Sequence, residues 1–228
     1  MYSFLFASIP CLLLYFLTAP FADEPDAAGT GTRHGSYWLA FCLGFFPAIA
    51  WCIIDEFFIF ATHRFTDSLS ACYVYLLVKD SLLPTLPLSG LYLLLSRRPM
   101  ENRTFALLPL LSAFYMAYLP YTVTTGTERF SFFLCLVKPL LTCAHIALIT
   151  LGGRGLCRCI KSGMKALAAA FAALVLLAFA LPALAECLWY LLYSPVIYGS
   201  ITAFLLACML LLPVFLPKIA GKTLDKSL

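Results

Sequence analysis

The chain has 228 residues, of which 63% are hydrophobic and only 11% are charged, and its formal net charge is +4. An ordinary soluble domain carries roughly 25% charged residues, so this composition excludes a soluble globule. The mean hydropathy of +0.95 and the clustering of basic residues between apolar runs give no support to nucleic-acid binding, and they predict an integral membrane protein surrounded by the lipid bilayer.

Seven apolar runs follow one another along the chain. A helix needs about 20 apolar residues to cross the hydrocarbon core, whereas the strands of a membrane β-barrel alternate in segments of about ten residues. We therefore predict an all-α fold, a polytopic bundle of about seven transmembrane helices that forms a single domain over residues 1–228. The predicted spans are 2–21, 37–61, 69–96, 105–125, 130–151, 166–193 and 196–216.

The first apolar run is predicted to be a span and not a cleaved signal peptide. It has no basic residues at its start, and Pro20 occupies the minus-three position of the nearest cleavage-like site. The third run contains Pro84 and Pro87, which predict a kink or break in that span. Basic loops are predicted at 97–103 and 152–165.

The basic residues also predict the orientation of the bundle. With seven spans, eleven of the fifteen Lys and Arg residues lie on one side and two on the other, while Lys79 and Lys138 lie within spans. The positive-inside rule then places the N-terminus outside and the C-terminus in the cytoplasm. The predicted location is the plasma membrane, which in a bacterium is the inner membrane.

Ionisable side chains within the spans are the main functional candidates, because charges are costly in lipid and usually face a bundle interior or an aqueous cavity. At 1.5 Å per residue, most of them lie roughly 8 to 15 Å from the outer end of their spans, so we expect one polar layer in the outer half of the membrane. Four carboxylates and two ammonium groups in that layer suit a cation, a proton or an amine. The candidate binding residues are Asp55, Glu56, Lys79, Asp80, Lys138, His145 and Glu186, with the Tyr118 hydroxyl at similar depth.

Three functional hypotheses remain open. The first is a small transporter, or a membrane subunit that binds a solute or an ion in this layer. The second is an intramembrane hydrolase in which Glu56 or Glu186 activates water with help from His145. The third is a non-catalytic assembly or scaffold subunit whose partners are other membrane proteins. In that case the charges only fix how the helices pack. The sequence assigns no catalytic residue, metal or cofactor, and most of the ten cysteines lie in apolar runs where they behave as small hydrophobic residues.

Overall fold

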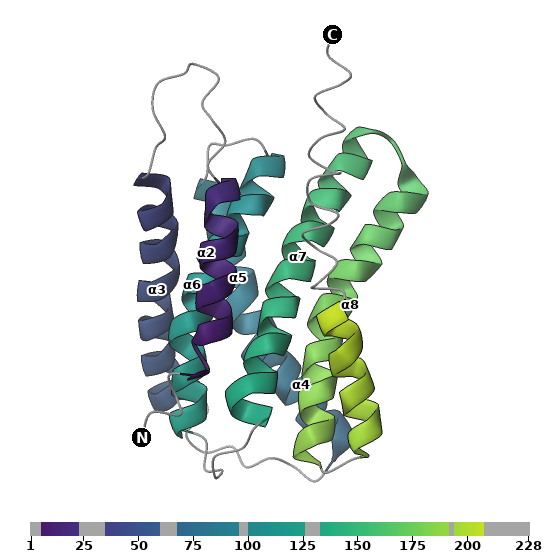
Figure 1. The fold of residues 1–228 in the computed structure, drawn as a ribbon. Coiled ribbons are helices and arrows are strands. Elements are labelled where there is room, and N and C mark those ends of the chain that lie inside the picture. Colours follow the sequence, from purple (N-terminus) through teal and green to yellow (C-terminus); the bar gives the residue numbers. More distant parts are fainter. Residues whose placement is uncertain are drawn as a thin grey trace.

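The computed structural model describes residues 6–22, 35–59, 68–95, 100–125, 133–191 and 194–207. The secondary structure in these ranges is helical and contains no strand. The all-α prediction is therefore confirmed there. The successive long helices alternate in direction along the bundle (Figure 1). The main helices are α2 (Ile9–Ala22), α3 (Gly35–Ile54), α4 (Leu69–Leu76), α5 (Leu83–Leu95), α6 (Met100–Thr125), α7 (Lys138–Lys161), α8 (Lys165–Tyr190) and the helix Pro195–Ala207.

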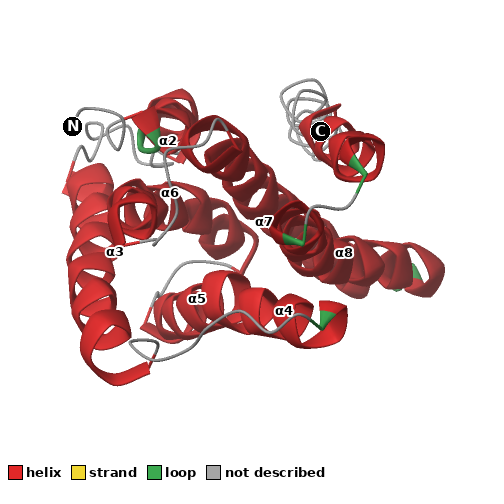
Figure 2. Cartoon of the chain, turned by 90° about the horizontal axis from the view of Figure 1, so that it is seen from below, coloured by secondary structure: helices red, strands yellow, loops and turns green. Residues whose placement is uncertain are grey.

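Helix α6 lies at the centre of one half of the bundle. It packs against α2, α3, α5 and α7, and α7 in turn packs along α8 (Figure 2). The core around α6 is formed by buried leucine and aromatic side chains such as Leu108, Leu111 and Phe114. A second core between α7 and α8 contains Leu141, Ala144 and Ala185 among others. Helix α7 therefore joins the two halves.

Three short π-helical turns interrupt or extend the α-helices. They are η1 (Asp55–Ile59) after α3, η2 (Leu77–Leu82) between α4 and α5, and η3 (Phe133–Val137) before α7. In η2, for example, the Leu83 N–H donates to the Val78 carbonyl five residues earlier. Each π turn shifts the following side chains out of the ordinary helical register, and such turns are frequent at functional sites.

Three helices in the described ranges are long and apolar enough to cross a membrane: Leu69–Leu94, Phe133–Lys161 and Lys165–Tyr190. A kink or break was predicted at Pro84 and Pro87, and the first of these helices shows that the break was wrong. The helix continues through both prolines, and the disturbance takes the form of the π turn η2 just before Pro84.

The predicted loop at 152–165 was also wrong, because α7 stays helical to Lys161. The glycines that suggested a loop instead allow α7 to approach α8 closely. A Cβ on Gly155 would overlap the Phe171 ring, and one on Gly152 would lie 2.6 Å from Val175. The loop predicted at 97–103 is shorter than expected for a simpler reason, since α6 already begins at Met100.

Candidate functional site: a buried ion-pair cluster

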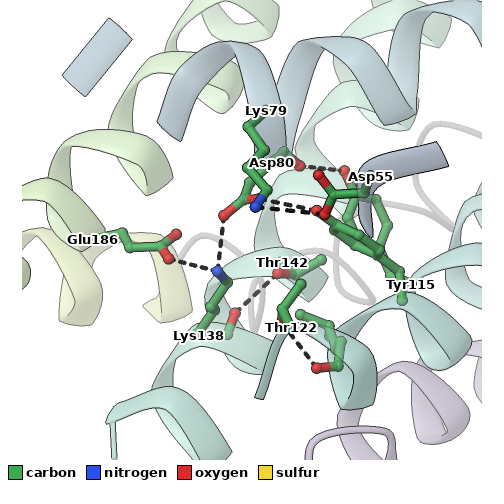
Figure 3. Close-up of polar contacts among 10 residues, drawn as sticks. Asp55, Lys79, Asp80, Tyr115, Thr122, Lys138, Thr142 and Glu186 are labelled. Atoms are coloured by element: carbon green, nitrogen blue, oxygen red, sulfur yellow. Dashed lines mark hydrogen bonds and ion pairs between the residues drawn. The ribbon is translucent and has the colours of Figure 1, made fainter. Parts of the chain in front are cut away.

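The Lys138 ammonium lies between two carboxylates from different helices (Figure 3). Its Nζ is 2.8 Å from Asp80 Oδ2 and 2.5 Å from Glu186 Oε1. Asp80 comes from η2, Lys138 from the first residue of α7 and Glu186 from the C-terminal part of α8. The three side chains form a triad and are 13%, 9% and 7% exposed, so Lys138 and Glu186 are buried and Asp80 is partly buried.

A second ion pair joins η1, which directly follows α3, to η2. Lys79 Nζ is 3.4 Å from Asp55 Oδ2 and 5.7 Å from the centre of the Tyr75 ring. Asp55 is only 2% exposed, and its other oxygen, Oδ1, has no hydrogen-bond partner among the described residues. Lys79 and Asp80, adjacent in η2, therefore contact opposite neighbours, Asp55 on one side and the triad on the other.

Two tyrosines of α6 bind Asp80. The Tyr118 hydroxyl donates to Asp80 Oδ1 at 3.2 Å, and the Tyr115 hydroxyl donates to the Asp80 backbone carbonyl at 2.8 Å. In a regular α-helix this carbonyl would accept from the N–H of residue 84, but Pro84 has none. The proline thus leaves a backbone acceptor that Tyr115 uses, and this contact fixes η2 against α6.

His145 lies two turns beyond Lys138 on α7 and is buried. Its Nδ1 is 2.7 Å from the Ala178 carbonyl of α8, and its Nε2 is 3.3 Å from Thr85 Oγ1. Thr85 Oγ1 is in turn 3.0 Å from the Tyr115 hydroxyl. His145 is therefore linked through α5 and α6 to the backbone of Asp80.

Glu56 is the one candidate in the described residues that lies apart from the cluster. It is exposed, and its Oε2 accepts a hydrogen bond from the Tyr121 hydroxyl at 2.7 Å. Without Glu56, the cluster holds three carboxylates, Asp55, Asp80 and Glu186, against the two ammonium groups of Lys79 and Lys138. When all five groups are ionised, the cluster carries a net charge of −1.

The positions of the π turns explain how distant helices bring these charges together. Asp55 is the first residue of η1, Lys79 and Asp80 lie within η2, and Lys138 directly follows η3. One extra residue in a turn redirects the side chains beside it relative to the regular apolar stripe. The helices can therefore keep apolar faces in their main packing contacts and still aim these charged residues at one another.

A small cavity of about 20 Å³ adjoins the triad. Its lining includes Asp80, Lys138 and Glu186, together with Tyr115 and His145. That volume is enough for a single water molecule with polar partners. In this conformation the site can hold a water or a small cation, and it is too small for an organic amine.

The described part of the chain contains no group of metal ligands and no disulfide. No set of three or more His, Cys, Asp or Glu side chains in those ranges is placed to hold a metal ion. Nine cysteines in the same ranges are free thiols, and two of them, Cys11 of α2 and Cys143 of α7, approach with their sulfur atoms 3.7 Å apart.

Comparisons with protein-family models, curated proteins and solved structures find no match to this chain. The site must be interpreted from its own geometry. That geometry brings Asp55, Lys79, Asp80, Lys138, Glu186 and Tyr118 into one cluster, links His145 to it indirectly and leaves Glu56 outside.

Thr85 is the residue that sequence reasoning missed. It is a buried hydroxyl between Pro84 and Pro87, and a lone threonine in an apolar span is easily read as a neutral packing residue. One signal was present in the sequence: Ser81 lies four residues before Thr85, so the two hydroxyls share a helix face, and Ser81 also lines the cavity.

Proposed function

We propose that this chain is a polytopic membrane protein that binds a small cation at the Asp80–Lys138–Glu186 triad and works as a small transporter. The observation that carries the proposal is that one buried and one partly buried carboxylate share one ammonium group. A buried site with an uncompensated negative charge is unfavourable unless a proton or a monovalent cation balances it. The triad therefore favours binding of one positive charge.

The surface of the bundle supports the membrane part of the proposal. Large apolar side chains are exposed on several helices, among them Phe57 at 73%, Leu94 at 84% and Leu176 at 71%. A soluble monomer rarely exposes extensive apolar surface, whereas lipid is the natural solvent for such side chains. The seven-span arrangement and the plasma-membrane location belong to this proposal.

The shape of the site supports a small ion more than an organic solute. The cavity beside the triad holds about one water, and the carboxylates already contact Lys138 directly. The π turn η2, which carries both Lys79 and Asp80, offers a place where the third predicted span can change its register during transport. The hydrolase hypothesis has weaker support, because Glu56 does not line the cavity that His145 lines, and Glu186, which does line it, is already paired with Lys138.

Ion flux into sealed vesicles tests the proposal. The purified chain is reconstituted into lipid vesicles with a trapped pH-sensitive dye, and a potassium gradient with valinomycin supplies the driving force. Parallel vesicles carry a sodium-sensitive dye. We expect proton or sodium entry above that of protein-free vesicles. Asp80→Asn removes the excess charge while leaving the Lys138–Glu186 pair, so it should reduce the flux at least about tenfold without lowering the amount of folded protein.

The matched control is Lys165→Met, which removes an exposed charge at the start of α8, outside the cluster. This variant should conduct like the unmodified chain. Vesicles that admit neither protons nor sodium faster than protein-free vesicles would overturn the transport proposal. The same holds if Asp80→Asn leaves the flux unchanged.

A further inference from the structure

Four hydrogen-bonding contacts form a continuous chain through the interior of the bundle. They join the Ala178 carbonyl to His145 Nδ1 at 2.7 Å, His145 Nε2 to Thr85 Oγ1 at 3.3 Å, Thr85 Oγ1 to Tyr115 Oη at 3.0 Å, and Tyr115 Oη to the Asp80 carbonyl at 2.8 Å. Thr85, Tyr115 and His145 are each at most 2% exposed. Bulk water is therefore not available to complete the hydrogen bonds of this chain.

Both ends of the chain have a fixed direction. The Ala178 and Asp80 carbonyls can only accept, so His145 Nδ1 must carry a proton and Tyr115 must donate to Asp80. Thr85, in the middle, has one hydroxyl proton and contacts on both sides. It can donate to His145 Nε2 or to Tyr115 Oη, but not to both.

The number of protons then depends on the charge of His145. A neutral imidazole with its proton on Nδ1, together with Thr85 and Tyr115, supplies three protons for four contacts. One of the two contacts of Thr85 then brings two oxygen or nitrogen lone pairs together without a hydrogen. The imidazolium supplies the fourth proton on Nε2. Three bonds then point from His145 through Thr85 and Tyr115 to Asp80, and Nδ1–H donates to the Ala178 carbonyl.

The charges around His145 also favour one more proton. The titratable groups that line the cavity with His145 are Asp80 from η2, Tyr115 and Tyr118 from α6, Lys138 from α7 and Glu186 from α8. Thr85 of α5 and Phe179 of α8 add no charge. With the tyrosines neutral, the cavity carries two negative charges and one positive charge. Burial alone would keep His145 neutral, but an imidazolium here would balance the excess carboxylate.

We infer that the cation bound at this site is a proton and that His145 is its second binding position, coupled to Asp80 through Thr85 and Tyr115. The inference rests on the proposed function and names its substrate. In the transfer, the O–H bond of a protonated Asp80 or Glu186 breaks and the Nε2–H bond of His145 forms, with the proton crossing the water-sized cavity. The carboxyl group becomes an anion and the imidazole a cation, so the total charge is unchanged.

This arrangement links proton position to the contacts between helices. When the proton is on His145, the hydrogen-bond chain is complete and holds the Asp80 carbonyl through Tyr115. When the proton is on a carboxylate, one of the two contacts of Thr85 lacks a hydrogen, while Tyr115 still donates to the Asp80 carbonyl. Movement of one proton within the bundle thus changes how firmly Thr85 of α5 is bonded to Tyr115 of α6 or His145 of α7.

Nitrogen NMR of a single-histidine chain tests the inference. The sequence has three histidines, so His34→Gln and His63→Gln leave His145 as the only signal. In ¹⁵N-histidine-labelled protein reconstituted in lipid nanodiscs, the two nitrogen shifts report the charge and the tautomer directly. We expect an imidazolium signal that persists to near-neutral pH. It should change to the neutral form with its proton on Nδ1 when Glu186→Gln removes the excess charge.

Two matched pairs of variants sharpen the result. Glu101→Gln, near the start of α6, also removes a carboxylate and should leave the His145 signal as it was. Thr85→Val breaks the chain and should lower the proton affinity of His145 by about tenfold, which is one pH unit in the titration midpoint. Thr150→Val is its control, because the Thr150 hydroxyl is buried but donates only within α7. It should leave the midpoint unchanged.

A neutral His145 at every pH in the unmodified chain would overturn the inference. An imidazolium signal that is the same in the unmodified chain, Glu186→Gln and Thr85→Val would overturn it as well. These outcomes are separable from failure of the proposed function. Proton or sodium flux with a permanently neutral His145 would keep the transporter and reject the His145 site. A coupled imidazolium in vesicles that show no flux would keep the proton site and reject transport.

Discussion

At the scale of single residues, the three members of the triad are not equivalent. Lys138 contacts both carboxylates, whereas Asp80 and Glu186 each contact only the lysine within the triad. Removing either carboxylate leaves a balanced ion pair, but removing the lysine leaves two carboxylates together. Breaking a buried pair so that a charge is left without a partner typically costs about 3 to 5 kcal/mol.

We therefore predict that Lys138→Met lowers the free energy of unfolding by about 3 to 5 kcal/mol. Asp80→Asn and Glu186→Gln should each lower it by about 1 kcal/mol, because a neutral amide of the same size replaces the carboxylate and the other carboxylate still pairs with Lys138. Reversible unfolding in mixed micelles measures all three values. Lowering the pH protonates the carboxylates, so the deficit of Lys138→Met should shrink in acid.

The triple variant Asp80→Asn/Lys138→Met/Glu186→Gln serves as the control for this asymmetry. With no charge left in the triad, it should recover most of the stability lost in Lys138→Met. Equal losses for the three single variants would contradict the view that the lysine holds the two carboxylates in place.

At the scale of helices, the sequence predicted more of the fold than of the site. Apolar run length is enough to place helices, because every backbone group of a membrane helix is satisfied within it. The residues of the cluster were recognisable as costly charges in apolar surroundings. Their exact partners were not, since a π turn depends on local packing and has no reliable sequence pattern. Without η2, the directions of Lys79 and Asp80 could not be deduced.

The role of a glycine is also hard to predict, because a glycine can indicate either a loop or a close contact between helices. The sequence around Gly152 and Gly155 predicted a loop, but both glycines lie in α7. Gly44 lies where α3 meets α6, and a Cβ there would overlap the Leu110 carbonyl oxygen, a backbone atom that cannot rotate away.

We predict that Gly44→Ala lowers the stability by about 1 to 3 kcal/mol, because the two helices must separate to admit the methyl group. Gly90→Ala in α5 is the matched control, since nothing lies within 4 Å of the position that its methyl group would occupy. It should be neutral or stabilise the protein by about 0.5 to 1 kcal/mol through the better helix propensity of alanine. Thermal unfolding of the two variants in the same detergent compares them directly, and equal losses would show that the α3–α6 contact is not tight.

At the scale of the whole molecule, the proposed membrane orientation follows from charge and not from the contacts between helices. Figure 1 shows that α3 ends, α7 begins and α8 ends in the same half of the bundle. Asp55 directly follows α3, Lys138 begins α7 and Glu186 lies near the end of α8. Under the positive-inside rule that half is the outer one. The cluster would then face the cell exterior more closely than the cytoplasm.

Reporter fusions test this orientation. Green fluorescent protein joined after Leu228 should fluoresce, because it does not fold after export through the general secretory route, whereas alkaline phosphatase at the same position should be inactive. The reverse pattern would place the C-terminus outside, contrary to the asymmetry of eleven against two basic residues.

The ion-pair triad joins three segments of the chain that are synthesised one after another, so it can form only in stages. Asp80 precedes Lys138 by 58 residues, and Lys138 precedes Glu186 by 48. The helix that carries Asp80 thus leaves the ribosome well before either triad partner has been made. In a membrane, that helix cannot be released into lipid with its charge satisfied until α7 arrives, and the triad closes only with α8. Chains truncated before α8 would lack Glu186 and keep only the Asp80–Lys138 pair of the triad.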